Sequence, residues 1–101
     1  NKNITIIQKN FRTRLGEIDI IAQKGDVIVF VEVKTRKSRN FPILETISLT
    51  KQKRVIRAAQ QFILRNNISD KSLRFDVITV LMSGCRREVS HIENAFTALP
   101  Q

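Results

Sequence analysis

Residues 17–34 read EIDIIAQKGDVIVFVEVK, and this stretch decides the fold. Residue types alternate on both sides of Gly25-Asp26, a pattern typical of two β-strands joined by a tight turn. We expect strands over residues 17–22 and 27–34, lying antiparallel to each other. In the first strand, the alternation predicts one face with Glu17, Asp19 and Ile21 and another with Ile18, Ile20 and Ala22. In the second, it predicts one face with Val27, Val29, Val31 and Val33 and another with Ile28, Phe30, Glu32 and Lys34.

Further strands are predicted on both sides of this hairpin. Residues 4–11 are rich in Ile and Thr and predict a strand before it. Residues 73–82 predict a strand later in the chain, and residues 88–92 predict a short strand at the edge of the sheet.

A helix is expected between the hairpin and the later strand. It should begin near Ser48 or Thr50, either of which can cap its N-terminus, and end near Asn66. Its buried face is predicted to consist of Val55, Ala58, Ala59, Phe62 and Ile63. The order strand-strand-strand-helix-strand predicts an α/β fold with a mixed sheet, and a length of 101 residues predicts one domain over residues 1–101.

The charge balance favours a polyanionic partner. Eighteen Lys and Arg against nine Asp and Glu give a net charge of +9, and nucleic acid is the commonest polyanion in a cytoplasm. Six Phe, without Tyr or Trp, disfavour a platform that stacks single-stranded bases on aromatic rings. The longest uncharged apolar runs are too short to span a membrane. One cysteine and one histidine exclude an internal disulfide framework and a zinc cage, and we expect a cytoplasmic protein.

Charged residues interrupt the apolar runs of the hairpin. Burying a carboxylate is costly unless something pairs with it, yet Glu17, Asp19 and Glu32 all stand in strong strands. A cross-strand salt ladder on a solvated face is one interpretation. The other is convergence of these three acids with Lys34 around a divalent cation, Mg²⁺ or Mn²⁺. Asp19, Glu32 and the Val33 carbonyl would then be the metal ligands, and Lys34 would orient the attacking water in phosphodiester hydrolysis.

Several short strings, in this order, resemble a known family. They are NFR (10–12), GEIDIIA (16–22), FVEVKTR (30–36), KQK (51–53), RFDV (74–77) and NAF (94–96). Asp19 followed by Glu32-Val33-Lys34 also resembles the Asp…Glu-x-Lys signature of restriction-endonuclease-like nucleases. Together the strings resemble the YraN-like family of bacterial proteins, predicted endonucleases distantly related to archaeal Holliday-junction resolvases.

The resemblance implies a restriction-endonuclease-like core, a mixed β-sheet flanked by helices. It implies that Asp19, Glu32 and Lys34 are the metal-binding and catalytic residues and that Glu17 is an accessory acid. Proteins of this family usually begin with a helix that carries another glutamate, whereas this sequence begins at Asn1. We therefore expect a helix to precede the first strand in the intact protein.

Basic residues near the acids are predicted to contact nucleic acid. Lys51 and Gln52 stand at the helix start, where backbone N–H groups favour phosphate. The other residues of this predicted rim are Arg12, Arg14, Arg36 and Lys37. Asp76 is expected to be structural, paired with Arg74 or Arg12, and His91 is expected on the surface of the edge strand.

Three functions follow from these patterns. The first is a Mg²⁺-dependent DNA endonuclease acting on branched or duplex DNA, and a homodimer would suit the symmetric cutting of two strands. The second is a non-catalytic nucleic-acid-binding module that retains a nuclease fold. The third, an RNA-binding protein, depends on charge alone and leaves the acids within the strands unexplained.

Overall fold

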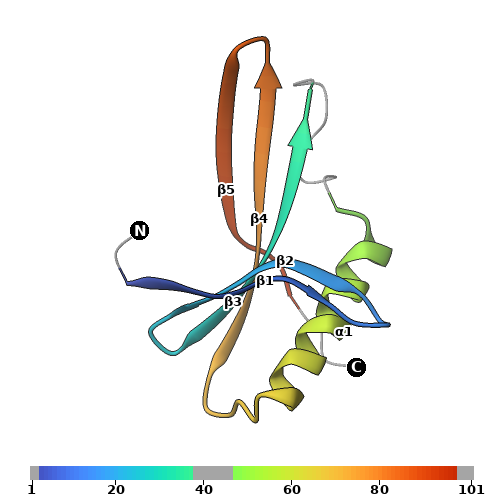
Figure 1. Cartoon of the computed structure of the whole chain (residues 1–101), viewed down its shortest axis with the longest axis vertical. Coiled ribbons are helices and arrows are strands. Elements are labelled where there is room, and N and C mark those ends of the chain that lie inside the picture. The colour runs from blue at the N-terminus through green and yellow to red at the C-terminus, as the bar shows by residue number, and fades with distance from the viewer. Residues whose placement is uncertain (1–2, 38–46, 98–101) are drawn as a thin grey trace.

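The computed structural model describes residues 3–37 and 47–97. Its elements follow the predicted order and are β1 (Ile4–Arg12), β2 (Glu17–Lys24), β3 (Val27–Arg36), α1 (Leu49–Arg65), β4 (Ser72–Ser83) and β5 (Arg86–Phe96). The sheet has the strand order β1-β2-β3-β4-β5, in which β3 and β4 are parallel and every other pair is antiparallel (Figure 1). This confirms the α/β fold class with a restriction-endonuclease-like mixed sheet.

Helix α1 is the crossover that the parallel pair β3–β4 requires. Ser48 caps its N-terminus by accepting a hydrogen bond from the backbone N–H of Lys51 at 3.1 Å, and Asn66 is the C-terminal cap. Its buried residues are Val55, Ala58, Ala59 and Phe62, as the spacing predicted, whereas Ile63 is partly buried.

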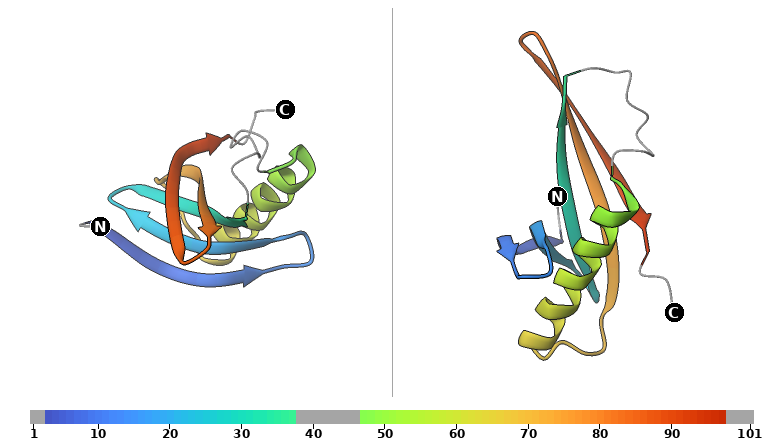
Figure 2. Two further views of the ribbon diagram at one scale, coloured as in Figure 1. Left: turned by 90° about the horizontal axis from the view of Figure 1, so that it is seen from above. Right: turned by 90° about the vertical axis from the view of Figure 1, so that its right-hand side faces the viewer.

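The main core lies between α1 and one face of the sheet (Figure 2). Phe62 of α1 packs edge-on against Phe11 and Phe30, with ring centroids 5.3 and 6.1 Å apart. The opposite face carries a smaller cluster built on Ala22, Val29 and Val31.

The predicted alternation of β2 fails at Ile18. This side chain is fully buried in the helix-side core together with Ile21, whereas Ile20 packs against the opposite cluster. Ile18 pairs with Phe11, and the neighbouring Asn10 has a φ of 54°. The left-handed residue interrupts the regular pleat there, which accounts for the loss of strict alternation.

The sheet divides where the charged residues begin. Strands β2 and β3 pair only from Lys24↔Val27 to Ile20↔Val31. Beyond this point β2 continues beside β1, while β3 continues beside β4 as far as Arg36↔Leu81. Figure 1 shows the result: β3 rises with β4, and the β1–β2 hairpin turns away towards α1. A fork therefore opens between β2 and β3.

Strand β5 is longer than predicted, covering Arg86–Phe96 instead of residues 88–92. Most of its residues are exposed, so the apolar alternation that marks a half-buried strand is weak there. No helix in the described part of the chain has the length and apolarity that crossing a bilayer requires.

Candidate metal centre and basic groove

Asp19 links the two strands at the fork. Its Oδ2 accepts a hydrogen bond from the backbone N–H of Val33 at 2.8 Å. This bond ties β2 to β3 after their backbone pairing has ended at Ile20↔Val31. Because the N–H and C=O of one strand residue point to the same side, the Val33 carbonyl also faces the fork.

Glu32 is buried beside it, with 4% of its surface exposed. Its Oε2 lies 3.6 Å from the Nζ of Lys34 and 3.6 Å from the Nζ of Lys51, which comes from the first turn of α1. Its Oε1 is also buried but accepts no hydrogen bond from any described residue. Burial and then the charge of Asp19 raise the pKa of Glu32, although the two lysines act in the opposite direction.

These donors fit a hard divalent cation. Magnesium prefers oxygen ligands and is usually held by one or two carboxylates, with water and substrate phosphate completing its shell. Asp19, Glu32 and the Val33 carbonyl supply oxygens of this kind, and the buried Oε1 of Glu32 lacks a partner. In residues 3–37 and 47–97, no group of three or more His, Cys, Asp or Glu is placed to hold a metal, so no third acid joins Asp19 and Glu32.

Glu17 does not join this pair, which corrects the expectation that three carboxylates converge. Its Oε2 pairs with Arg12 Nε at 3.2 Å, and half of its side-chain surface is exposed. The register explains this position, because Glu17 lies directly opposite Arg12 on β1. The structure therefore brings Asp19, Glu32 and Lys34 together and leaves Glu17 on the β1 side.

A basic groove lies next to the carboxylates, between the β1–β2 turn and the start of α1. It has a volume of about 340 Å³ and is lined by Arg12, Thr13, Arg14, Leu15, Gly16, Glu17, Lys51 and Arg54. Lys51 belongs to both sites, because its ammonium also contacts Glu32. Three residues of the predicted rim, Arg12, Arg14 and Lys51, therefore line one groove.

Arg54 is a groove residue that was not among the predicted ones. The sequence did carry a signal for it: residues 49–65 contain five cations and no acid, and Arg54 follows Lys51 by three positions, on the same side of a helix. Lys51 is a cation in the first turn of α1, where it opposes the helix dipole, and this turn has no acid to compensate. Such an arrangement suits the binding of an anion.

The remaining predicted rim residues lie elsewhere. The Gln52 side chain donates a hydrogen bond to the Ile47 carbonyl at 3.1 Å and so stabilises the start of α1. Arg36 is half-buried at the end of β3, Lys37 follows it and is exposed, and neither lines the groove.

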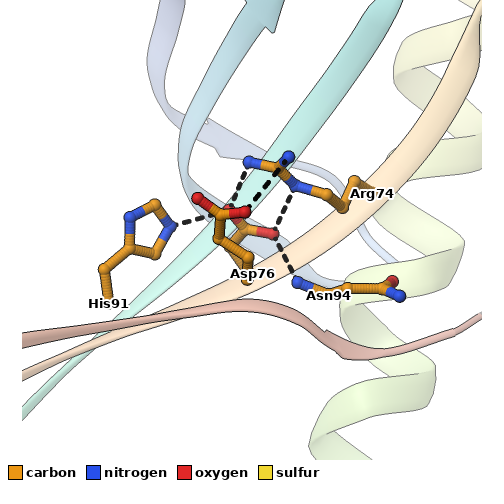
Figure 3. A network of polar contacts seen from close by, with 5 residues as sticks. Arg74, Asp76, His91 and Asn94 are labelled. Atoms are coloured by element: carbon orange, nitrogen blue, oxygen red, sulfur yellow. Dashed lines mark hydrogen bonds and ion pairs between the residues drawn. The ribbon is translucent and has the colours of Figure 1, made fainter.

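Asp76 is a second buried carboxylate, and both of its oxygens accept hydrogen bonds (Figure 3). Arg74 binds it through two nitrogens, each 2.9 Å from a carboxylate oxygen. His91 Nε2 lies 2.7 Å from Oδ2, and the backbone N–H of Asn94 donates to Oδ1 at 2.9 Å. Burial alone would raise the pKa of Asp76, but these hydrogen bonds outweigh it and lower the pKa. The partner is Arg74, one of the two arginines predicted for this position.

Comparison with known proteins identifies relatives over most of the chain. Residues 1–80 match the model of "Uncharacterised protein family UPF0102". A UPF0102 protein of Alkaliphilus oremlandii is 50% identical over 99 residues, which cover 95% of this chain and 85% of that protein. One from Clostridioides difficile is 42% identical over 97 residues, covering 95% of this chain and 83% of that protein. One from Geobacter metallireducens is 44% identical over 92 residues, covering 90% and 75%.

Proposed function

Starting from the fact that the chain belongs to family UPF0102, we propose that it is a metal-dependent endonuclease that hydrolyses phosphodiester bonds in DNA. The observation that carries the proposal is the burial of Glu32 together with its incomplete hydrogen bonding. A carboxylate that is 4% exposed, with one oxygen lacking any described partner, is costly for a fold to keep. A divalent cation shared with Asp19 would offset that cost.

Asp19, Glu32 and the Val33 carbonyl would hold Mg²⁺ or Mn²⁺. When bound, such a cation acts as a Lewis acid, lowering the pKa of water and neutralising charge on the scissile phosphate. The hydrogen bond from Val33 to Asp19 fixes that carboxylate before any ligand arrives, which keeps the donors in place.

Two lysines would act on the substrate. Lys34 is about one-third exposed and lies beside Glu32, so its ammonium can orient an attacking water and stabilise negative charge that develops on the phosphate. Lys51 lies at the same carboxylate and at the groove, so it can hold the phosphate next to the scissile position. Arg12, Arg14 and Arg54 would bind the neighbouring backbone, in keeping with the net charge of +9.

Cleavage of supercoiled plasmid and of four-way-junction DNA with Mg²⁺ or Mn²⁺ tests the proposal. Asp19→Asn and Glu32→Gln should each lower the rate by at least about a hundredfold, because each removes a ligand charge. Asp26→Asn is the matched control, since Asp26 is an exposed turn carboxylate paired with Lys71, and this variant should cleave like the wild type. Cleavage that survives both site substitutions would overturn the proposal.

A non-catalytic nucleic-acid-binding module is the alternative, favoured by one observation. Lys34 and Lys51 already contact Glu32 and partly neutralise it without a metal. This alternative expects salt-sensitive DNA binding that is independent of divalent ions and unaffected by Glu32→Gln. Calorimetry with Mn²⁺ separates the two, because heat of binding in the wild type that is lost in Asp19→Asn supports the metal centre.

A further inference from the structure

The β1–β2 turn, residues 13–16, is unusually well fixed for an exposed loop. Thr13 Oγ1 accepts hydrogen bonds from the backbone N–H groups of Leu15 and Gly16, at 3.0 and 3.1 Å. The Thr13 hydroxyl and backbone N–H both donate to the Gly16 carbonyl. The turn also packs directly on α1, because a Cβ at Gly16 would lie 2.3 Å from the Arg54 carbonyl oxygen. Turn and helix therefore form one rigid wall.

Leu15 stands exposed on this wall, with 45% of its surface accessible. A single exposed leucine needs no explanation in itself. Leu15, however, lines two hollows at once: the groove that contains Lys51 and Arg54, and a second one of about 440 Å³ that extends to Gln61 and Arg65. An apolar side chain on a hydrogen-bonded turn thus lies between two surfaces lined by cations.

The sizes of these hollows indicate what they can accept. Volumes of about 340 and 440 Å³ fall in the range of small-ligand sites, roughly 300–1,000 Å³. Each has room for a phosphate with part of its nucleotide, and Leu15 between them offers an apolar contact to a base that is not stacked inside a duplex. The arrangement differs from an aromatic stacking platform, because one aliphatic side chain would contact a base and the arginines would contact the backbone.

We propose that the β1–β2 turn and α1 bind an unpaired DNA strand next to the scissile phosphate. Lys51 places this strand next to the carboxylates, because its ammonium lies 3.6 Å from Glu32 and its side chain also lines the groove. Arg14 and Arg54 bind phosphates, and Leu15 packs against an unstacked base. Glu17 also lines the groove, but its charge is paired with Arg12 at 3.2 Å. This inference rests on the proposed nuclease function and names its substrate class: DNA with a single-stranded segment beside the cut.

Binding measured without cleavage tests this inference. Fluorescence anisotropy of the wild-type protein in EDTA compares a duplex with a splayed-arm DNA of the same length and sequence, at one salt concentration. We expect the splayed arm to bind about tenfold more tightly than the duplex. Leu15→Ser should weaken binding of the splayed arm about five- to tenfold and leave duplex binding unchanged.

Matched controls lie on α1. Leu64 is an exposed leucine that lines neither hollow, so Leu64→Ser should bind both DNAs like the wild type.

The arginine contacts are tested in the same way. Arg54→Gln should weaken the splayed-arm complex and reduce the slope of its salt dependence by about one. Arg57→Gln removes an exposed helix cation outside the hollows and should have a smaller effect. Thermal melting of each variant checks that the fold is retained.

The inference is overturned if duplex and splayed arm bind equally, or if Leu15→Ser has no more effect than Leu64→Ser. Tighter binding of the same splayed arm made of RNA would also overturn it. Failure here leaves the nuclease proposal intact, because that proposal is tested by cleavage and by metal binding. Conversely, a protein that prefers the splayed arm but never cleaves would contradict the nuclease proposal and the position beside a cut, and would keep the binding of an unpaired strand.

Discussion

Glu32 and Asp76 are both buried carboxylates on neighbouring parallel strands, yet they differ in nearly every other respect. Glu32 lies on the helix side of the sheet, whereas Asp76, paired with Val31 in register, lies on the opposite face. Asp76 accepts hydrogen bonds at both oxygens from Arg74, His91 and Asn94. Glu32 has two lysines at 3.6 Å from one oxygen, and its other oxygen lacks a described partner.

The pKa directions express this difference. Burial raises the pKa of Glu32, whereas at Asp76 the hydrogen bonds outweigh burial and lower the pKa. A carboxylate whose partners are all supplied by the fold contributes to stability. A buried carboxylate whose partners are incomplete suits a ligand instead. The comparison therefore separates an acid whose partners the fold supplies from one whose partners are incomplete.

The largest expected effect comes from replacing Asp76. Asp76→Asn should lower the free energy of unfolding by about 3–5 kcal/mol, because it leaves the mostly buried Arg74 guanidinium with Glu93, at 3.7 Å, as its remaining acidic partner. Urea denaturation followed by circular dichroism measures this. A loss below about 1 kcal/mol would mean that Asp76 is not the structural acid of the pair.

The free energy of unfolding, measured as the pH is lowered from 7, should distinguish the two acids. The pKa of Asp76 is lowered by folding, so its stabilisation is complete above the unfolded pKa and is lost as pH falls through the folded pKa. The pKa of Glu32 is raised by folding, so its charge destabilises the native state above that pKa, and acidification relieves this. Urea midpoints of the wild type, Asp76→Asn and Glu32→Gln from pH 7 to pH 3 test both directions.

As the pH falls in that series, the difference in urea midpoint between Glu32→Gln and the wild type should disappear first, at the higher pH. The difference in urea midpoint between Asp76→Asn and the wild type should persist to a lower pH. If the two gaps close together, the opposite pKa directions are wrong.

A moderate effect is expected at His91, the exposed end of the Asp76 network. His91→Ala removes one of several hydrogen bonds to a carboxylate that keeps Arg74 and Asn94, so it should cost about 1–1.5 kcal/mol. Ser90→Ala, at the neighbouring exposed position of β5, is the control and should change stability by less than about 0.5 kcal/mol.

The smallest change in stability is expected at Glu32. Glu32→Gln loses two ion pairs to partly exposed lysines, each worth about 0–1 kcal/mol, but removes a costly buried charge. The two effects offset each other, so the free energy of unfolding should stay within about 1 kcal/mol of the wild type. A loss as large as that of Asp76→Asn would make Glu32 a structural residue as well.

Much of the fold could be predicted because the sequence patterns are local. The hairpin turn, the cap at Ser48 and the buried stripe of α1 all follow from residue spacing. The edge strand was underestimated, because its exposed residues carry no burial pattern. The break in alternation at Ile18 depends on a left-handed residue of the neighbouring strand, which spacing within β2 does not show.

The candidate site was partly predictable for a similar reason. Strand parity places Glu32 and Lys34 on one side, and the hairpin brings Asp19 to them. Parity could not show that β2 leaves β3 at Ile20, so Glu17 was expected in the site. The contact of Lys51 with Glu32 depends on how α1 packs on the sheet, and the Asn94 bond to Asp76 depends on a register shift in β5.

The close approach of Gly16 to the carbonyl of Arg54 has a consequence for recognition. Because no side chain separates hairpin from helix, the backbone positions of Arg12 and Arg14 keep a set spacing from those of Lys51 and Arg54. In the proposed complex with DNA, little backbone entropy would then have to be lost on association. A methyl group at position 16 would push the two walls apart and thereby change the spacing between the arginines of the hairpin and the cations of the helix.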